Sequence, residues 1–162
     1  MTQLDQYKQW LNESESALVS SYKSYGLKAS GRWEKELENR IEQSQDKIKL
    51  LILGASYTGA MNTGRSRNTK QTPESIRAFV GWAGSTFLAQ WVKDKGLSIN
   101  PYAVAYKIAR DGVKVPNQHN AGNFIEHAIN EQRVQSLISI VRTGMLEDLK
   151  SDVMKAFKNG NN

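Results

Sequence analysis

The feature that most constrains this fold is a long row of apolar residues near the end of the chain. The row begins at Phe124 and reaches Phe157, at intervals that fit the 3.6-residue period of a helix. Its members are Phe124, Ile125, Ala128, Ile129, Leu137, Ile138, Val141, Met145, Leu149, Val153 and Phe157. The pattern predicts a long helical region over residues 124–158. Thr143 and Gly144 interrupt it, and we expect Thr143 to cap a second helix there.

A second helical pattern occupies the start of the chain. Large apolar residues recur at spacings of three, four and seven, as on one face of an amphipathic helix. They are Leu4, Tyr7, Leu11, Leu18, Tyr22 and Tyr25. Gly26 follows as a stop signal. We therefore expect an N-terminal helix within residues 1–25.

Two further helices have clear start signals. Thr72-Pro73 and Asn100-Pro101 each place a capping side chain before a proline, which is favoured in the first helical turn. The first pattern ends at residues 93–96 and the second at residues 111–112, each closing on a glycine. Gly81 and Gly84 lie inside the first pattern and indicate a bend or a close helix contact.

Residues 30–54 fit two structures. Trp33, Leu37 and Ile41 are four residues apart, as in a helix. Apolar and polar residues also alternate from Leu37, and a polar turn at residues 44–46 precedes the apolar run 48–53, as in two strands. Periodicity alone supports both.

The segment 58–71 is expected to be an exposed basic loop. It contains Gly and Asn residues and only one large apolar residue, Met61, so little in it can drive burial. Arg65, Arg67 and Lys70 lie in it, and Arg77 follows closely. Guanidinium and ammonium groups in such a loop suit the carboxylates of a neighbouring subunit or the phosphates of a nucleic acid.

Composition limits the class of protein. The chain has 162 residues, 39% of them hydrophobic and 23% charged, which predicts one globular domain. The net charge of +6 fits either a dispersed soluble protein or one that meets polyanions. Cysteine is absent, and no apolar run is long enough to span a membrane.

No motif for catalysis, a cofactor or a metal stands out. His119 and His127 are eight residues apart and lack the close ligand pair of a zinc site. Gly54 and Gly59 have the spacing of a phosphate-binding loop, but the lysine and hydroxyl residues that should follow are missing. We therefore expect a non-enzymatic protein with no cofactor. Trp82 lies off the apolar face of its helix and is a candidate subunit contact.

The order of four short motifs resembles the tail-completion, or head–tail joining, proteins of tailed bacteriophages, especially those of phages of Bacteroidetes. The first motif is residues 26–32, and the second is Tyr57 with Asn62-Thr63-Gly64-Arg65. The third is Pro73, Ile76, Trp91 and Lys95-Gly96. The fourth is residues 106–112, followed by Asn123-Phe124 and Ala128. Residues 81–85 depart from the family pattern as an insertion, and the segment 113–122 lacks its usual Gly-Thr pair.

The resemblance implies a fold, a function and partners. The fold is α+β and mostly helical, with a small antiparallel hairpin at about residues 34–54 packed by the N-terminal and C-terminal helices. The function is that of a virion neck component, assembled in the host cytoplasm as a ring of identical copies between the portal or adaptor proteins and the tail proteins. Channel DNA is a further non-specific partner, and a basic nucleic-acid-binding accessory protein is the alternative function. The interface candidates are Arg65, Arg67, Lys70, Arg77, Trp82, Tyr57, Asn62 and Gly64.

Overall fold

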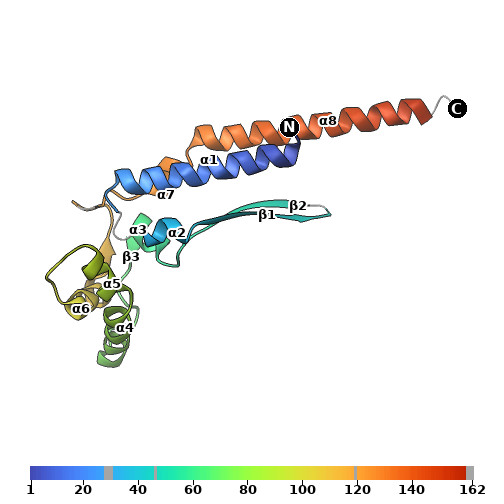
Figure 1. Ribbon diagram of the computed structural model, residues 1–162. Helices are drawn as coiled ribbons and strands as arrows, with labels where there is room; N and C mark the ends of the chain where they lie inside the picture. The colour runs from blue at the N-terminus through green and yellow to red at the C-terminus, as the bar shows by residue number, and fades with distance from the viewer. Residues whose placement is uncertain (28–30, 46, 119, 160–162) are drawn as a thin grey trace.

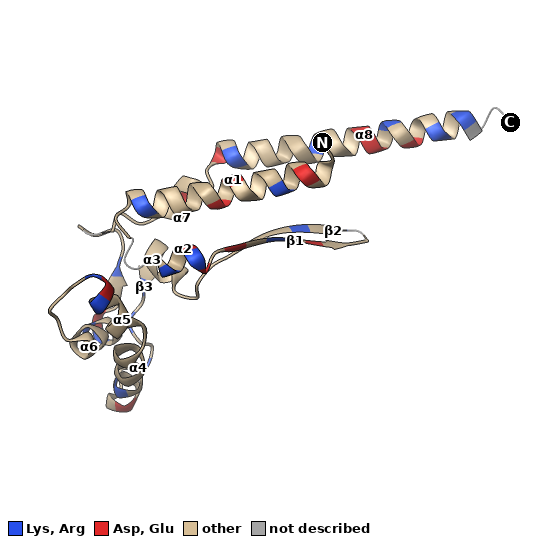
Figure 2. Ribbon diagram, viewed as in Figure 1, with Lys and Arg blue, Asp and Glu red and all other residues tan. Residues whose placement is uncertain are grey.

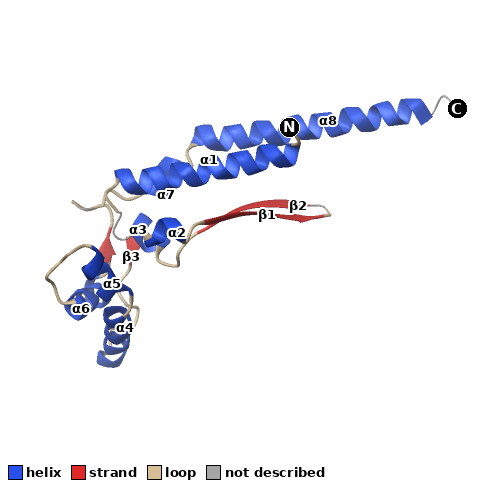
Figure 3. Cartoon of the chain, in the orientation of Figure 1, coloured by secondary structure: helices blue, strands red, loops and turns tan. Residues whose placement is uncertain are grey.

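The computed structural model describes residues 1–27, 31–45, 47–118 and 120–159. It is 63% helical with small antiparallel sheets, which confirms the expected mostly helical α+β fold (Figure 3). The helices are α1 (Gln3–Ser24), α2 (Arg32–Lys35), α3 (Thr58–Thr63), α4 (Pro73–Ser85), α5 (Phe87–Asp94), α6 (Pro101–Asp111), α7 (Phe124–Ala128) and α8 (Glu131–Asn159). The strands are β1 (Glu38–Ser44), β2 (Lys47–Leu53), β3 (Gly64–Arg65) and β4 (Val113–Lys114).

The elements form an elongated arrangement (Figure 1). Helices α1 and α8 lie side by side, and the β1–β2 hairpin extends along α1. Helices α4, α5 and α6 gather at one end, and the last half of α8 projects at the other. The short β3–β4 pair connects the α4–α6 group to the remainder.

Helix α1 starts with a reciprocal cap. The Thr2 hydroxyl accepts the Asp5 amide at 3.2 Å, and the Asp5 carboxylate accepts the Thr2 amide at 2.9 Å. These two bonds satisfy donors that a helix start leaves unpaired. The helix buries one face at helical spacing, composed of Tyr7, Trp10, Leu11, Ser14, Leu18, Ser21 and Tyr22. Its end at Ser24 confirms the predicted N-terminal helix.

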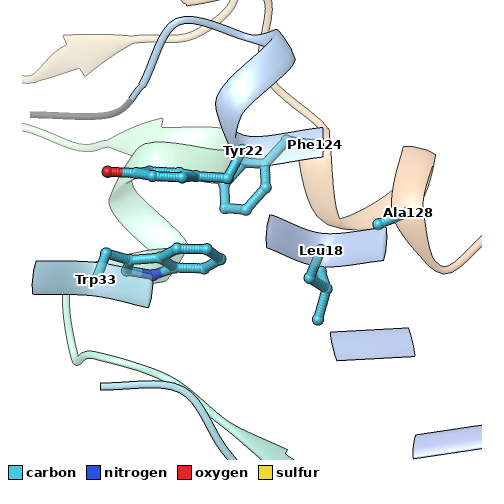
Figure 4. Packing of buried hydrophobic residues seen from close by; sticks show 5 residues of the cluster. All are labelled: Leu18, Tyr22, Trp33, Phe124 and Ala128. Carbon is cyan, nitrogen blue, oxygen red and sulfur yellow. The ribbon is translucent and has the colours of Figure 1, made fainter. Parts of the chain in front are cut away.

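An aromatic cluster joins α1 to α2, α3 and α7 (Figure 4). The Tyr22 and Trp33 rings stack with centroids 4.4 Å apart, and Phe124 meets both rings edge-on. Phe124 is fully buried, and the Ser21 hydroxyl donates to its carbonyl at 2.8 Å. The Trp33 indole donates to the Thr58 hydroxyl at 2.9 Å. Large aromatic side chains from three separate parts of the chain thus form the main core.

A second, separate apolar cluster lies among α4, α5 and α6. Its buried members are Ala83, Leu88 and Ala105. Gly84 allows the close approach of α4 to α6, because a Cβ there would lie 2.5 Å from the Tyr102 ring. The predicted close helix contact at this glycine is confirmed. Helix α4 ends one residue later, and α5 begins after Thr86.

The remaining predicted boundaries are confirmed in the main. Thr72 and Asn100 cap α4 and α6, each with proline in the first turn. The hairpin is present, although its first expected residues form α2 and its pairing runs from Glu38 with Leu53 to Ser44 with Lys47. The residues 28–30 of the first resemblance motif, residue 46 of the expected turn, His119 and the end at 160–162 lie outside the described residues.

Two predictions are wrong. Residues 58–65 of the expected exposed loop form α3 and β3, because Met61 packs on the aromatic core and β3 pairs with β4. The expected interruption at Thr143 is also wrong, since α8 is continuous from residue 131 to 159. A break does occur earlier, at Ile129, between α7 and α8. Gly144 has a packing role instead, because the Gln3 side chain fills the space beside it.

Candidate interface surfaces

Hydrogen bonds hold the segment 65–71 against the C-terminal end of α6. The Asn68 amide donates to the Ala109 carbonyl at 2.9 Å, and the Gln71 side chain donates to the same carbonyl at 3.1 Å. A side chain on Gly112 would collide with the backbone of this segment. The close approach fixes the backbone, while the side chains of Arg67 and Lys70 are exposed.

The Arg65 side chain makes its contacts within the fold. Its guanidinium lies 4.2 Å from the centre of the Phe79 ring, which is a favourable cation–π distance. One guanidinium nitrogen donates to the Asn68 side chain at 2.9 Å. Another is buried and has no hydrogen-bond partner among the described residues. Arg65 thus connects β3 to α4, and little of its charge faces the surface.

The fold adds basic residues that the local sequence did not connect with this segment. Lys107 and Arg110 lie on α6, and Lys114 pairs with Gly64 across β3 and β4. The Asp111 carboxylate holds Arg110 at 2.7 Å. Its hydrogen bonds and attraction raise the pKa of Arg110, and Arg110 lowers the pKa of Asp111.

A shallow hollow lies beside the basic segment, between α4 and α6. It measures about 310 Å³ and is lined by Gln71, Pro73, Ile76, Arg77, Val80 and Tyr106. Arg77 is exposed, as expected for an interface candidate. With Arg67 and Lys70 it gives this end of the molecule outward-facing cations (Figure 2).

Trp82 is the most exposed tryptophan among the described residues, with 60% of its surface accessible. Its ring packs edge-on against Phe79 at 5.9 Å and Phe87 at 5.3 Å between centroids. These contacts restrict the indole while leaving much of it open. An aromatic ring that is held in place and still exposed is suited to anchoring a protein contact.

The other three interface candidates make contacts within the fold. Asn62 is 4% exposed, and its side chain bonds to Glu126 and to the Ile125 amide. Gly64 has a φ of 85°, and the Val113 carbonyl occupies the space that a Cβ would need. Tyr57 is half-buried against the aromatic core. Asn62 is thus not available for surface contacts, and Gly64 is needed for the close approach of β3 to β4.

The end of α8 holds exposed apolar residues that the sequence analysis assigned to a helix without predicting their exposure. Nine of the nineteen exposed large hydrophobic side chains of the described chain lie on this one helix, so α8 is its richest apolar surface. The periodicity was recognisable, but no sequence signal shows that α1 begins beside Gly144 and covers α8 no further.

Within the described residues, no three histidine or carboxylate side chains gather as a metal site would require. No helix in that part of the chain is both long and apolar enough to cross a bilayer. Comparisons with protein-family models, curated proteins and solved structures found no match.

Proposed function

We propose that this chain is a non-catalytic structural subunit of a tailed-phage particle, placed as a ring of identical copies between the portal side of the head and the tail. The proposal rests first on the four resemblance motifs, which span residues 26 to about 130. The observation that carries it is the exposed, restrained Trp82 together with the outward cations Arg67, Lys70 and Arg77.

Such a surface suits a contact between subunits. A ring closes through a heterologous contact, in which one face of each copy meets a different face of the next. An indole held by Phe79 and Phe87 loses little conformational freedom on contact, and arginines pair well with carboxylates of a neighbour. The α4–α6 end is therefore the face that we assign to the neighbouring subunit.

Native mass spectrometry and negative-stain imaging of the purified chain test the proposal. We expect a closed oligomer with a central opening, and we expect Trp82→Ala to lower its abundance at a given concentration. Ile48→Ala is the control, because it truncates another exposed apolar side chain, 41% accessible, on β2 and outside the α4–α6 end. Absence of any ring at all concentrations, with and without tail and portal proteins, would overturn the proposal.

A nucleic-acid-binding role is the second candidate, favoured by one specific observation. Helix α6 and strand β4 contact the 65–71 segment, and they carry Lys107, Arg110 and Lys114. These residues add positive charge beside Arg67 and Lys70. Phosphate contacts of this kind give binding that falls steeply as salt rises. A salt titration of the isolated chain with duplex DNA separates the candidates: tight binding by a monomer supports this second role.

A further inference from the structure

The last part of α8 has no partner in the rest of the described chain. Gly144 is buried beside Gln3, the first residue of α1. Helix α8 continues beyond this start of α1 (Figure 1). From residue 145 to 158, which we term distal α8, every residue is exposed. At 1.5 Å per residue this segment extends about 20 Å beyond α1.

Distal α8 is amphipathic. At 100° per residue, its large apolar side chains fall on one half of the helix surface. They are 44–70% exposed and comprise Met145, Leu146, Leu149, Val153, Met154 and Phe157, which we term the apolar face. The acidic residues and two of the three lysines lie on the other half.

The apolar face points away from α1. Helix α8 meets α1 on the side that carries Arg133 and Gly144, since Trp10 donates to the Arg133 carbonyl at 2.9 Å. The same side of distal α8 carries Ser151, Lys155 and the other polar residues. A second molecule can therefore approach the apolar face without displacing α1.

Leaving this face in water is unfavourable. The six side chains expose on the order of 700 Å² of largely apolar surface, beyond the few hundred Å² usual for a monomer. Cover for the apolar face by another molecule would therefore be favourable.

We propose that distal α8 packs against distal α8 of a second copy, apolar face to apolar face. Complete mutual burial of the six side chains would remove up to about 1,400 Å² in total, which lies within the range of stable interfaces. No other element of the described chain offers an exposed apolar row of similar length. This pairing goes beyond the proposed ring and does not depend on it.

The charge of distal α8 favours a second copy over a polyanion or an acidic membrane. Three acidic residues, Glu147, Asp148 and Asp152, balance three lysines, 150, 155 and 158 (Figure 2). The segment is neutral while the whole chain carries +6. Two copies can meet here without net repulsion, and a polyanion finds no excess positive charge.

Sedimentation equilibrium over a concentration series tests the pairing. We expect the chain carrying Trp82→Ala, which weakens the proposed ring contact, to reach a mass about twice the 18.2 kDa of one copy. Leu149→Glu should weaken the association on the order of a hundredfold, because each copy would bury a charge in the contact. The matched control is Ser151→Glu, which adds the same charge on the polar side. Circular dichroism verifies that both variants keep the wild-type helix content.

Single cysteines give an independent measurement, because the chain has none of its own. Copies carrying Val153→Cys should be joined by a short thiol-specific cross-linker, whereas copies carrying Ser151→Cys should not. Equal cross-linking of the two variants, or a wild-type chain that stays monomeric at tens of micromolar, would overturn the pairing. Loss of the pairing in Leu149→Glu with the ring retained would support the pairing as a contact separate from the ring and would leave the proposed function intact.

Discussion

Asn62 was a candidate interface residue, but its contacts indicate a role inside the fold. Replacing Asn62 by alanine distinguishes these two roles. The side-chain amide of Asn62 donates to both Glu126 carboxylate oxygens, at 3.0 and 2.8 Å. Its carbonyl oxygen accepts the Ile125 amide at 3.0 Å. The last bond satisfies a free donor in the first turn of α7, which positions Phe124 in the aromatic core.

The expected cost of Asn62→Ala follows from these contacts. Losing the bond to the Ile125 amide costs about 1 kcal/mol, as for other helix caps. The bonds to Glu126 contribute about 1 kcal/mol more, since the exposed carboxylate recovers water. Because Asn62 is only 4% exposed, truncation of its side chain also leaves a small cavity. The total is about 2–3 kcal/mol, or roughly 5–10 °C in melting temperature for a chain of this size.

Urea unfolding followed by tryptophan fluorescence measures this loss. Thr63→Ala is the control, because Thr63 is exposed and its hydroxyl only donates to the Gly59 carbonyl at 3.2 Å. We expect the control to stay within about 0.5 kcal/mol of the wild type. Equal stability of Asn62→Ala and Thr63→Ala, combined with lost assembly, would refute the internal role and restore Asn62 as an interface residue.

Asn62→Asp sharpens the same test. The substitution keeps an oxygen that can accept the Ile125 amide, but it places a carboxylate where Asn62 donated to Glu126. Two ionised carboxylates at this distance repel each other. Protonation of either one at low pH removes the repulsion. The destabilisation by Asn62→Asp should therefore shrink as the pH falls, whereas the destabilisation by Asn62→Ala should not.

Two further predictions concern α4 and α1. Gly84→Ala should destabilise the chain by about 1–3 kcal/mol, because its Cβ would lie 2.5 Å from the Tyr102 ring. Gly81→Ala in the same helix meets nothing within 4 Å and should stabilise it by up to about 1 kcal/mol, as chemical denaturation can measure. Hydrogen bonds from the Thr2 side chain and backbone lower the pKa of Asp5 below its ordinary 3.8. Its contribution is therefore present above that value and lost as the pH falls through the lower folded value, a loss that should be missing from the acid unfolding of Asp5→Ala.

Local chemistry made several elements predictable from the sequence. Thr72 and Asn100 cap their helices with side chains only one residue from the proline, so the signal lies within a few residues. Gly112 likewise ends α6 with a φ of 77°. The hairpin at about 34–54 followed from the resemblance and not from periodicity, since Trp33 continues a helical pattern with Leu37 and does lie in a short helix. The backbone leaves that helix after Lys35, and strand pairing begins at Glu38.

The errors have a common physical cause: contacts with segments far away in the sequence determine which structure these residues adopt. Residues 58–65 contain too few apolar side chains to fold alone, but Asn62 gains partners from residues 125 and 126, and Gly64 gains a partner strand from residues 113–114. The basic candidates divide in the same way: Arg65 lies over the Phe79 ring, whereas the Arg67 side chain is exposed.

Distal α8 shows the converse case, in which the predicted helix is present and its apolar side is exposed. A row such as Met145, Leu149 and Val153 predicts a helix with one buried side, because apolar side chains favour contact with other protein. Among the described residues, α1 covers α8 only as far as Gly144, where α1 begins. The apolar face beyond that point has the same need for burial as the core of the fold. The pairing that we propose would meet this need, which is why a charge at Leu149 should affect association and leave the fold of the monomer unchanged.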